Sequence, residues 1–299
     1  MTRISVCICT FKRPEPLKRL LSELTRQETE GEFVFSIVVA DNDSARSAEE
    51  VVCNFAAQSS IAVRYCVEPR QGIALARNKV VENADGDFLA FIDDDEFPTP
   101  RWLICLLKTL REYNVVGVLG PVRPHFDSAP PRWVIDGQFH NRPEDPTGMR
   151  LSVTKCRTGN ALLSRELFAD QEHPFRPECL TGEDQDFFRR MIDKGHTFIW
   201  CNEAVVYEAV PPTRWTRGFL VRRAMFRGMF SIRNHNHRFP VGRMFRTFVA
   251  VPAYGVALPV ALIFGQAGFM SIACKLSYHL GRIFGMIGLN PIRQPYVAE

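Results

Sequence analysis

Short apolar runs alternate with longer amphipathic stretches through the first 120 residues of the chain. The apolar runs are rich in Val, Ile, Phe and Cys, which predicts strands, and the amphipathic stretches predict helices. The predicted strands are Ile4–Cys9, Phe35–Ala40, Ile61–Val67, Asp87–Ile92 and Val115–Leu119, and the predicted helices between them are Pro14–Arg26, Ala45–Ala57, Ile73–Asn83 and Arg101–Tyr113. This alternation predicts an α/β fold in which a mostly parallel sheet carries helices on both faces.

The rest of the chain is less regular. Residues 121–150 are rich in Pro, Asp and His and predict a long surface loop, and an irregular block runs from Leu151 to Glu208. Residues 214–246 carry nine arginines among Phe, Trp and Met, and Thr247–Phe264 is a run of 18 residues without a charge. We therefore expect three parts, residues 1–120, 121–213 and 214–299, of which the last is a basic, hydrophobic and helical segment.

The charge distribution separates the last part from the others. The whole chain carries a net charge of +4, but no acid occurs between Glu208 and Glu299. Residues 1–208 hold 25 basic and 32 acidic residues, a net charge of −7, whereas residues 209–299 hold 12 and one, a net charge of +11. The two parts must therefore meet different partners.

Composition and cysteine usage point to a globular, intracellular protein. The 299 residues are 46% hydrophobic and 23% charged, as in an ordinary globular protein, and suffice for one large domain and an appendage. The nine cysteines show no metal-binding spacing, and their odd number favours buried, reduced thiols. The chain enters a predicted strand at Ile4, which leaves no room for a signal peptide, so a reducing cytoplasm is expected. His235 and His237 lack acids or cysteines near them, which disfavours a metal site there.

Four consecutive acids, Asp93 to Glu96, follow the apolar run Phe88–Ile92. If the chain stays extended, Asp93 and Asp95 point the same way. Two carboxylates about 4 Å apart repel each other by about 1 kcal/mol in water and about 4 kcal/mol at an effective dielectric of 20. A divalent cation such as Mg²⁺ or Mn²⁺ would relieve this repulsion. The alternative is a polar strand end that runs into a solvated loop.

Two other polar clusters follow predicted strands. Thr10-Phe11-Lys12-Arg13 comes after the first strand, and Asp41-Asn42-Asp43-Ser44 comes after the second. In open α/β sheets the ligand lies beyond the carboxyl ends of the strands. The three clusters therefore predict one binding site.

Five motifs in order resemble family 2 glycosyltransferases. They are Cys9–Pro14, Val39–Ser44, Gly72–Asn78, Phe91–Glu96 and Thr181–Asp184. The resemblance covers about residues 4–225 and looks closest to succinoglycan-type exopolysaccharide glucosyltransferases. It implies a GT-A fold, a Rossmann-like sheet, and inverting transfer of a sugar from a nucleotide-diphosphate donor. Residues 1–120 would form the nucleotide-sugar half and residues 121–213 the acceptor half.

The resemblance also implies a donor site. The residues expected to bind the nucleotide sugar are Thr10, Phe11, Arg13, Asp41, Asn42, Gly72, Arg77, Asn78, Asp93, Asp94, Gly159, Asn160, Arg222 and Arg223. Asp93 and Asp95 match the family's metal-binding pair for Mg²⁺ or Mn²⁺, with Asp95 as the direct ligand. Asp43 stands where the family usually has Gly. Turn formation by Asp41 and Asn42, and a solvated helix charge at Arg77, are the alternatives.

The resemblance places the catalytic base in the Glu183-Asp184 pair. Asp184 would take a proton from the acceptor hydroxyl, with Glu183 as a supporting residue and Asp186 as an alternative base. Thr181 to Asp184 also fits a helix capping box, which is the structural alternative.

The C-terminal part predicts membrane contact. A basic, aromatic face over residues 214–227 would suit a solvated helix face or nucleic acid, but the adjacent run Thr247–Phe264 favours anionic lipid or a lipid diphosphate. Eighteen residues reach the lower limit for a membrane span, although Pro252 and Pro259 interrupt the run. Re-entrant or interfacial attachment and a buried core helix are the alternatives. The preceding arginines would stay on the cytoplasmic side.

Together these features predict a membrane-associated glycosyltransferase at the cytoplasmic face. It would move a hexose, with UDP-glucose as the expected donor, onto a polyprenyl-diphosphate-linked saccharide, and it would not bind nucleic acid. A sugar nucleotidyltransferase is disfavoured because Thr10–Pro14 contains no Gly, and an aspartyl-nucleophile phosphatase because the acids follow the fourth strand rather than the first. A non-catalytic membrane-associated sugar-binding or assembly component is the remaining alternative.

Overall fold

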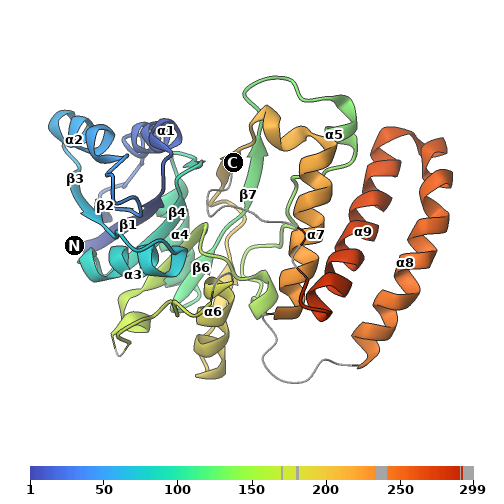
Figure 1. Ribbon diagram of the computed structural model, residues 1–299. Helices are drawn as coiled ribbons and strands as arrows, with labels where there is room; N and C mark the ends of the chain where they lie inside the picture. Colours follow the sequence, from blue (N-terminus) through green and yellow to red (C-terminus); the bar gives the residue numbers. More distant parts are fainter. Residues whose placement is uncertain (170, 180–181, 234–240, 290, 292–299) are drawn as a thin grey trace. The chain divides into compact units, whose positions relative to one another are not determined.

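The computed structural model describes residues 1–169, 171–179, 182–233, 241–289 and 291. The chain forms two compact units (Figure 1). Unit 1 consists of Met1–His125 and Arg142–Ala209, and unit 2 of Phe126–Asn141 and Val210–Glu299. The functional division expected at residues 120 and 213 stays a prediction.

A seven-stranded sheet forms the centre of unit 1. Its order is β3-β2-β1-β4-β8-β6-β9, with bounds Ala62–Val67, Phe33–Asp41, Thr2–Thr10, Phe88–Asp93, Asn160–Ser164, Gly117–Leu119 and Phe198–Trp200. Strands β1 to β4 are parallel, whereas β8 runs antiparallel to both β4 and β6. In this register Thr10 lies opposite Asp41, and Cys9 lies opposite Asp93. The polar clusters therefore meet at one edge of the sheet, as the sequence predicts.

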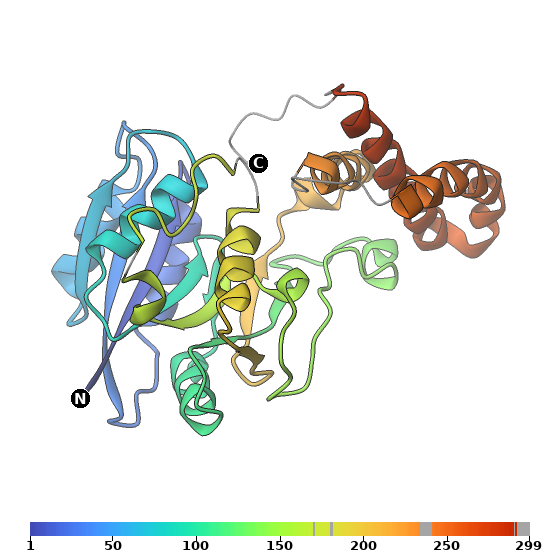
Figure 2. The same cartoon turned by 90° about the horizontal axis from the view of Figure 1, so that it is seen from below.

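Helices cover both faces of this sheet, as expected (Figures 1 and 2). One core cluster contains residues of α1 (Pro14–Leu24), α2 (Glu49–Gln58) and α4 (Trp102–Glu112). The other contains residues of α3 (Ile73–Asn83) and α6 (Glu183–Asp193). Each helix buries its apolar stripe against the sheet, which leaves the carboxyl ends of the strands for polar side chains.

Helix α2 begins at Glu49, four residues after the predicted start at Ala45. The carboxylates of two preceding aspartates accept backbone N–H groups in this stretch: Asp43 Oδ1 accepts from Ala45 N at 3.1 Å, and Asp41 Oδ2 accepts from Ala48 N at 2.8 Å. Side-chain bonds of this kind compete with the first helical turn and delay the helix.

The prediction of one long loop over residues 121–150 is wrong. The segment contains β7 (Val122–His125) and the short helix α5 (Arg132–Asp136). Strand β7 belongs to a three-stranded sheet with β10 (Val206–Ala209) and β5 (Glu96–Pro98). Its partner β10 lies more than 80 residues further along the chain, so no local pattern marks the pairing.

All nine cysteines are free thiols. The expectation that they are buried holds for Cys7, Cys156 and Cys201 but is wrong for Cys53, which is exposed on α2.

Unit 2 is helical. Apart from α5 and short 3₁₀ turns, its described helices are α7 (Arg217–Arg233), α8 (Val241–Ala261) and α9 (Gly265–Met286). Helix α9 lies between α7 and α8 (Figure 1). A side chain at Gly228 of α7 would collide with the Tyr278 carbonyl of α9, and one at Gly281 would collide with the Met225 carbonyl of α7. Helices α7 and α9 are therefore packed closely through glycine.

The predicted apolar run is continued by a second helix. Helix α8 ends in a 3₁₀ turn, Leu262–Phe264, and Gly265 at φ +74° starts α9, so the two helices form a hairpin. By length and composition, the described stretch Met244–Met286 can cross a membrane, and only 6% of its apolar 18-residue part is buried. This small buried share disfavours the core-helix alternative.

Candidate active site

The end of β1 is joined to the acidic run by side-chain contacts. Thr10 Oγ1 donates a hydrogen bond to Asp94 Oδ2 at 2.8 Å. Arg13 Nη1 lies 3.2 Å from both Asp94 Oδ1 and Asp95 Oδ2. Burial, opposed in part by the Arg13 charge, raises the pKa of Asp94 to about 6. Phe11 is the remaining candidate of this loop, and the centre of its ring lies 5.2 Å from Lys12 Nζ.

The expectation that the acidic run stays extended is wrong. Strand β4 ends at Asp93, residues 94–95 form a turn, and β5 starts at Glu96. Glu96 is 1% exposed, and its Oε2 accepts a hydrogen bond from the Asp93 backbone N–H at 3.1 Å. This bond closes the turn, in which Asp93 lies 3.8 Å from Arg77 and Asp95 contacts Arg13.

The side chains of Asp41 and Asn42 hold the neighbouring loops. Asp41 Oδ2 accepts from the Tyr65 hydroxyl at 2.9 Å, in addition to the backbone bonds described above. Asn42 donates to the carbonyls of Glu68 and Arg70 and accepts from the Gly72 N–H at 2.9 Å. These contacts favour the turn-forming alternative for both side chains, and contact with a nucleotide base stays a prediction.

Arg77 on α3 connects three elements. Its guanidinium forms an ion pair with Glu183 of α6 and lies 3.8 Å from Asp93 of β4. Burial lowers the pKa of Arg77, but the charges of Glu183, Asp184 and Asp93 outweigh burial and raise it. The buried, multiply paired guanidinium argues against a solvated helix charge at this position. Asn78 next to it exchanges two hydrogen bonds with the Phe175 backbone, at 2.7 and 2.9 Å.

The acids of α6 differ in their surroundings. Glu183 is 4% exposed and paired with Arg77. Asp186 is paired with Arg190 at 2.9 Å. Asp184 is only partly buried, and its Oδ1 accepts a hydrogen bond from the Gln185 N–H at 2.7 Å. Among the three, Asp184 has the surroundings best suited to a base that meets a substrate.

The start of α6 bears on the capping-box alternative. Thr181 lies outside the described residues. The N-cap position of α6 is Gly182, at φ +77°, which has no side chain to cap the helix. Asp184 is therefore the second residue of the helix rather than the third residue after a Thr cap.

The start of β8 reaches the acidic run because β8 is antiparallel to β4. A methyl group on Gly159 would lie 3.1 Å from Asp93 Oδ2 and 3.0 Å from Glu96 Oε1. The Asn160 amide is occupied inside the protein: it donates to the Pro121 and Ala204 carbonyls and accepts from Trp102 Nε1 at 2.8 Å. Gly159 thus lies beside the acids, whereas the Asn160 side chain connects β8 to the neighbouring segments through its hydrogen bonds.

The carboxylates fit a divalent ion that shares its coordination with substrate. No group of three His, Cys, Asp or Glu side chains with metal-binding geometry occurs in the described part of the chain. Glu96 Oε1, however, is buried and has no hydrogen-bond partner, and burial together with the Asp93 charge raises the Glu96 pKa. Mg²⁺ characteristically takes one or two carboxylates and completes its shell with phosphate oxygens and water. Asp93 and Asp95 could supply these protein ligands.

Sequence reasoning missed two residues beside the acids. The Arg142 guanidinium lies 2.5 Å from a Glu208 carboxylate oxygen. Burial lowers the pKa of Arg142, and Glu208, Glu96 and Asp93 together raise it. Glu208, the last acid before the long acid-free stretch, carries a sequence signal, but Arg142 lies in an irregular segment and carries none.

Arg222 and Arg223 belong to α7 of unit 2, where Arg223 Nη1 lies 3.5 Å from His140 Nδ1. Their contact with a nucleotide sugar stays a prediction. His235 and His237 lie outside the described residues.

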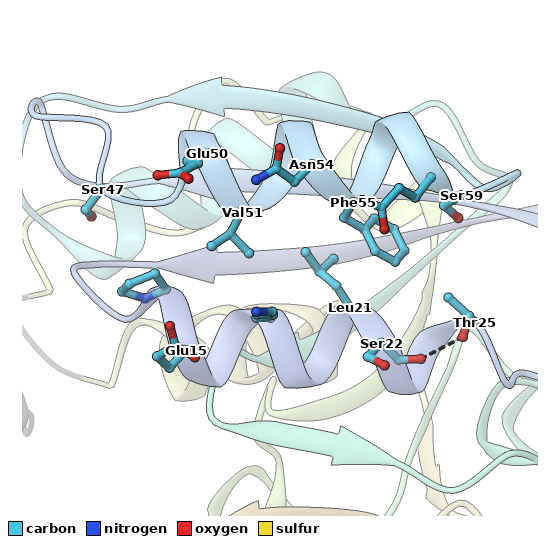
Figure 3. A pocket seen from close by; sticks show the side chains of 13 residues that line it. Glu15, Leu21, Ser22, Thr25, Ser47, Glu50, Val51, Asn54, Phe55 and Ser59 are labelled. Atoms are coloured by element: carbon cyan, nitrogen blue, oxygen red, sulfur yellow. Dashed lines mark hydrogen bonds between the residues drawn. The ribbon is translucent and has the colours of Figure 1, made fainter.

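A groove of about 880 Å³ between α1 and α2 is separate from these acids (Figure 3). Apolar side chains of Leu21, Val51 and Phe55 face it, together with polar side chains such as Glu15 and Glu50. None of the candidate donor, metal or catalytic residues lines it.

Comparisons with known proteins agree with this geometry. A sequence profile described as glycosyl transferase family 2 matches residues 5–171. The succinoglycan biosynthesis protein ExoM of Rhizobium meliloti (strain 1021) is 32% identical over 97% of this chain and 95% of its own length. The mannosyltransferase PcManGT from Pyrobaculum calidifontis, solved with GDP-Man and Mn²⁺, has 16% identity and a TM-score of 0.62 over 95% of this chain and 87% of its own. S. aureus TarS, solved with UDP, has 15% identity and a TM-score of 0.54 over 97% and 93% of the two chains.

The structural neighbours establish that the fold is GT-A-like, with a mixed α/β sheet. The profile match and the similarity to ExoM over almost the whole chain identify the family. The chain belongs to glycosyl transferase family 2.

Proposed function

We propose that this glycosyltransferase transfers a hexose with inversion from a nucleotide-diphosphate donor, expected to be UDP-glucose, to a polyprenyl-diphosphate-linked saccharide at the cytoplasmic face of the membrane. The observation that carries the proposal is the position of Arg77. Its ion pair with Glu183 and its contact with Asp93 hold the candidate base on α6 close to the acids at the end of β4. The succinoglycan role named for the similar Rhizobium protein supports an exopolysaccharide product.

On the donor side, Asp93 and Asp95 would hold Mg²⁺ or Mn²⁺, the latter being the ion found with GDP-Man in the solved mannosyltransferase. When bound, the ion would neutralise charge that develops on the leaving diphosphate. Arg13 would orient the acidic turn through Asp94 and Asp95. Gly159 lies so close to Asp93 and Glu96 that a side chain at this position would crowd both carboxylates.

On the acceptor side, Asp184 would accept the proton of the attacking hydroxyl. Arg77 pairs with the neighbouring Glu183, where the guanidinium charge opposes in part the rise in the Glu183 pKa that burial causes. Direct attack from the face opposite the leaving diphosphate inverts the anomeric centre. Such a single displacement needs only one general base, which Asp184 of α6 would provide.

Release of UDP tests this assignment against its rivals. The detergent-purified protein is incubated with UDP-glucose and other nucleotide sugars, a bacterial lipid extract, and either Mn²⁺, Mg²⁺ or EDTA. We expect UDP release and a glycosylated lipid product that require both lipid and metal. Donor binding without turnover under all conditions would favour the non-catalytic component. Formation of UTP and glucose 1-phosphate when pyrophosphate is added to UDP-glucose would favour a nucleotidyltransferase.

The membrane assignment has its own test, based on the hairpin tip. Ile263 and Phe264 are 81% and 75% exposed, and burying such side chains contributes about 1.5–3 kcal/mol each. Ile263→Glu with Phe264→Glu should therefore lower membrane partitioning at least about a hundredfold. High salt should leave the parent on the membrane and detergent should extract it, since salt screens the arginines but not apolar contact.

The control for this test is Thr213→Glu, which adds an acid at an exposed position of the same unit. It should fractionate with the parent. A parent protein that is soluble and monodisperse without detergent would contradict the membrane assignment.

A further inference from the structure

Three basic side chains gather where α8 begins and α9 ends. Arg246 lies on α8, and His279 and Arg282 lie on α9. Arg282 follows His279 by three residues, about one turn of α9, and Arg246 directly precedes Thr247 on α8. His279 Nδ1 is also 3.4 Å from the Thr247 hydroxyl. The hairpin thus brings three bases and a hydroxyl, from two helices, into one cluster, which we call the basic cluster.

Arg282 is the unusual member of the basic cluster. It is 8% exposed, and its Nε is buried without a hydrogen-bond partner among the described residues. Removing a guanidinium from water without an acceptor is costly, and buried arginines normally pair with a carboxylate or a phosphate. Arg282 is therefore in a position that an anion would stabilise.

The described chain offers no acid for this role in the surrounding helices. No Asp or Glu occurs between Glu208 and Glu299. The other segment of unit 2 contains Asp127 and Asp136, which are both exposed, and Asp136 is 3.8 Å from Arg132. The described part of unit 2 thus carries a strong positive charge around Arg282, which favours an anion from outside this unit.

The opposite end of the hairpin indicates which anion this is. The tip, Leu262–Phe264, is exposed and apolar, and so are several side chains along α8: Phe245, Phe248, Val249, Val256 and Val260. Seventeen residues separate Arg246 from Ile263, which is roughly 25 Å at 1.5 Å per helical residue. The hydrocarbon core of a bilayer is about 30 Å thick. A tip placed in the hydrocarbon therefore leaves the basic cluster near the level of the phosphates.

We propose that Arg246, His279 and Arg282 form a binding site for the phosphate of a membrane lipid. The proposal rests on the membrane assignment made above. Arginine offers several N–H donors that match phosphate oxygens. The phosphate has two sources, the head group of an anionic phospholipid or the diphosphate of a polyprenyl acceptor.

Vesicle flotation of the full-length protein tests the site without any sugar transfer. Three vesicle types are compared: phosphatidylcholine alone, phosphatidylcholine with phosphatidylglycerol, and phosphatidylcholine with a polyprenyl diphosphate. The parent should bind at least one anionic type more tightly than the neutral type. A preference for phosphatidylglycerol identifies the phospholipid as the source, and a preference confined to polyprenyl diphosphate identifies the acceptor.

Two variants and a matched control locate the preference. Arg282→Gln and Arg246→Gln should each reduce the preference for anionic over neutral vesicles by more than about fivefold. Fivefold is the effect expected when a single cation outside any specific site is lost from the surface. Lys275→Gln removes the same charge from an exposed position of α9 outside the basic cluster and should reduce the preference less. Binding to neutral vesicles should be unchanged in the two arginine variants. Arg246 is exposed, so Arg246→Gln tests the site even where Arg282→Gln disturbs folding.

Other outcomes separate the proposals. If Lys275→Gln and Arg246→Gln lost the same share of the preference for anionic vesicles, the basic cluster would act only as general surface charge and would not be a specific site. Equal binding of the parent to all three vesicle types would overturn the phosphate site and leave membrane attachment intact. A parent that binds no vesicles would overturn the membrane assignment itself.

Discussion

Asp184→Asn is expected to lower sugar transfer by about two to four orders of magnitude, the usual contribution of a general base, while donor binding stays nearly unchanged. The amide keeps the shape of the side chain and can still accept a hydrogen bond from the Gln185 N–H, as Asp184 does at 2.7 Å. It cannot accept the proton of the acceptor hydroxyl. Single-turnover transfer, together with UDP titration by calorimetry, measures the two effects separately.

Asp186→Asn is the matched control for this prediction. It makes the same change two residues along α6, at a carboxylate paired with Arg190 at 2.9 Å. We expect at most a small loss of transfer, because that ion pair is exposed in part and such pairs contribute little. If Asp186→Asn lost activity and Asp184→Asn kept it, the alternative base would be the correct one. Loss of both folding and donor binding in Asp184→Asn would instead assign Asp184 a structural role at the start of α6.

Asp95→Ala should abolish metal-dependent binding of the donor. The substitution removes the oxygen expected to connect the ion to the diphosphate, and metal stabilisation of a leaving group is worth several kcal/mol. Transfer should fall by roughly two or more orders of magnitude, since each 1.36 kcal/mol is a factor of ten. Calorimetric titration with UDP, in the presence of Mn²⁺ and of EDTA, checks the prediction.

Asp87→Ala provides a control near the other end of the same strand. Asp87 is exposed and contacts Arg3 at 3.7 Å, away from the acidic turn. It should bind UDP and Mn²⁺ like the parent. An Asp95→Ala protein that does the same would show that the metal ligands have been assigned to the wrong carboxylate.

The strand ends were predictable because periodicity is local. Each strand and helix of the first 120 residues carries its own apolar pattern, and parallel pairing then brings the carboxyl ends together at one edge. This reasoning placed Thr10, Asp41 and Asp93 together without a structure. The family resemblance added Arg77 and Glu183, which lie 106 residues apart and which no periodicity could have paired.

Contacts between distant segments determine the features of the site that the sequence did not predict. The contact of Asn42 and Asn160 with the nucleotide sugar stays a prediction, and their amides form hydrogen bonds with backbone groups brought in by distant segments. The acidic run bends because Glu96 folds back onto the Asp93 N–H, whereas alternation along a strand predicts a straight course. The residue type alone does not show whether a side chain binds the backbone or the substrate.

The helical unit is not a tail joined to the end of a finished enzyme. The chain leaves unit 1 after His125, returns at Arg142 and leaves again after Ala209. In unit 2, Val134 of the first excursion packs in one apolar cluster with Val210 and Trp215 of the second. During synthesis the first excursion therefore waits for about 70 further residues before its packing partners exist. Maturation of the helical unit is tied to completion of the sheets of unit 1. Removing unit 2 requires three cuts, after His125, before Arg142 and after Ala209, and a new join between His125 and Arg142.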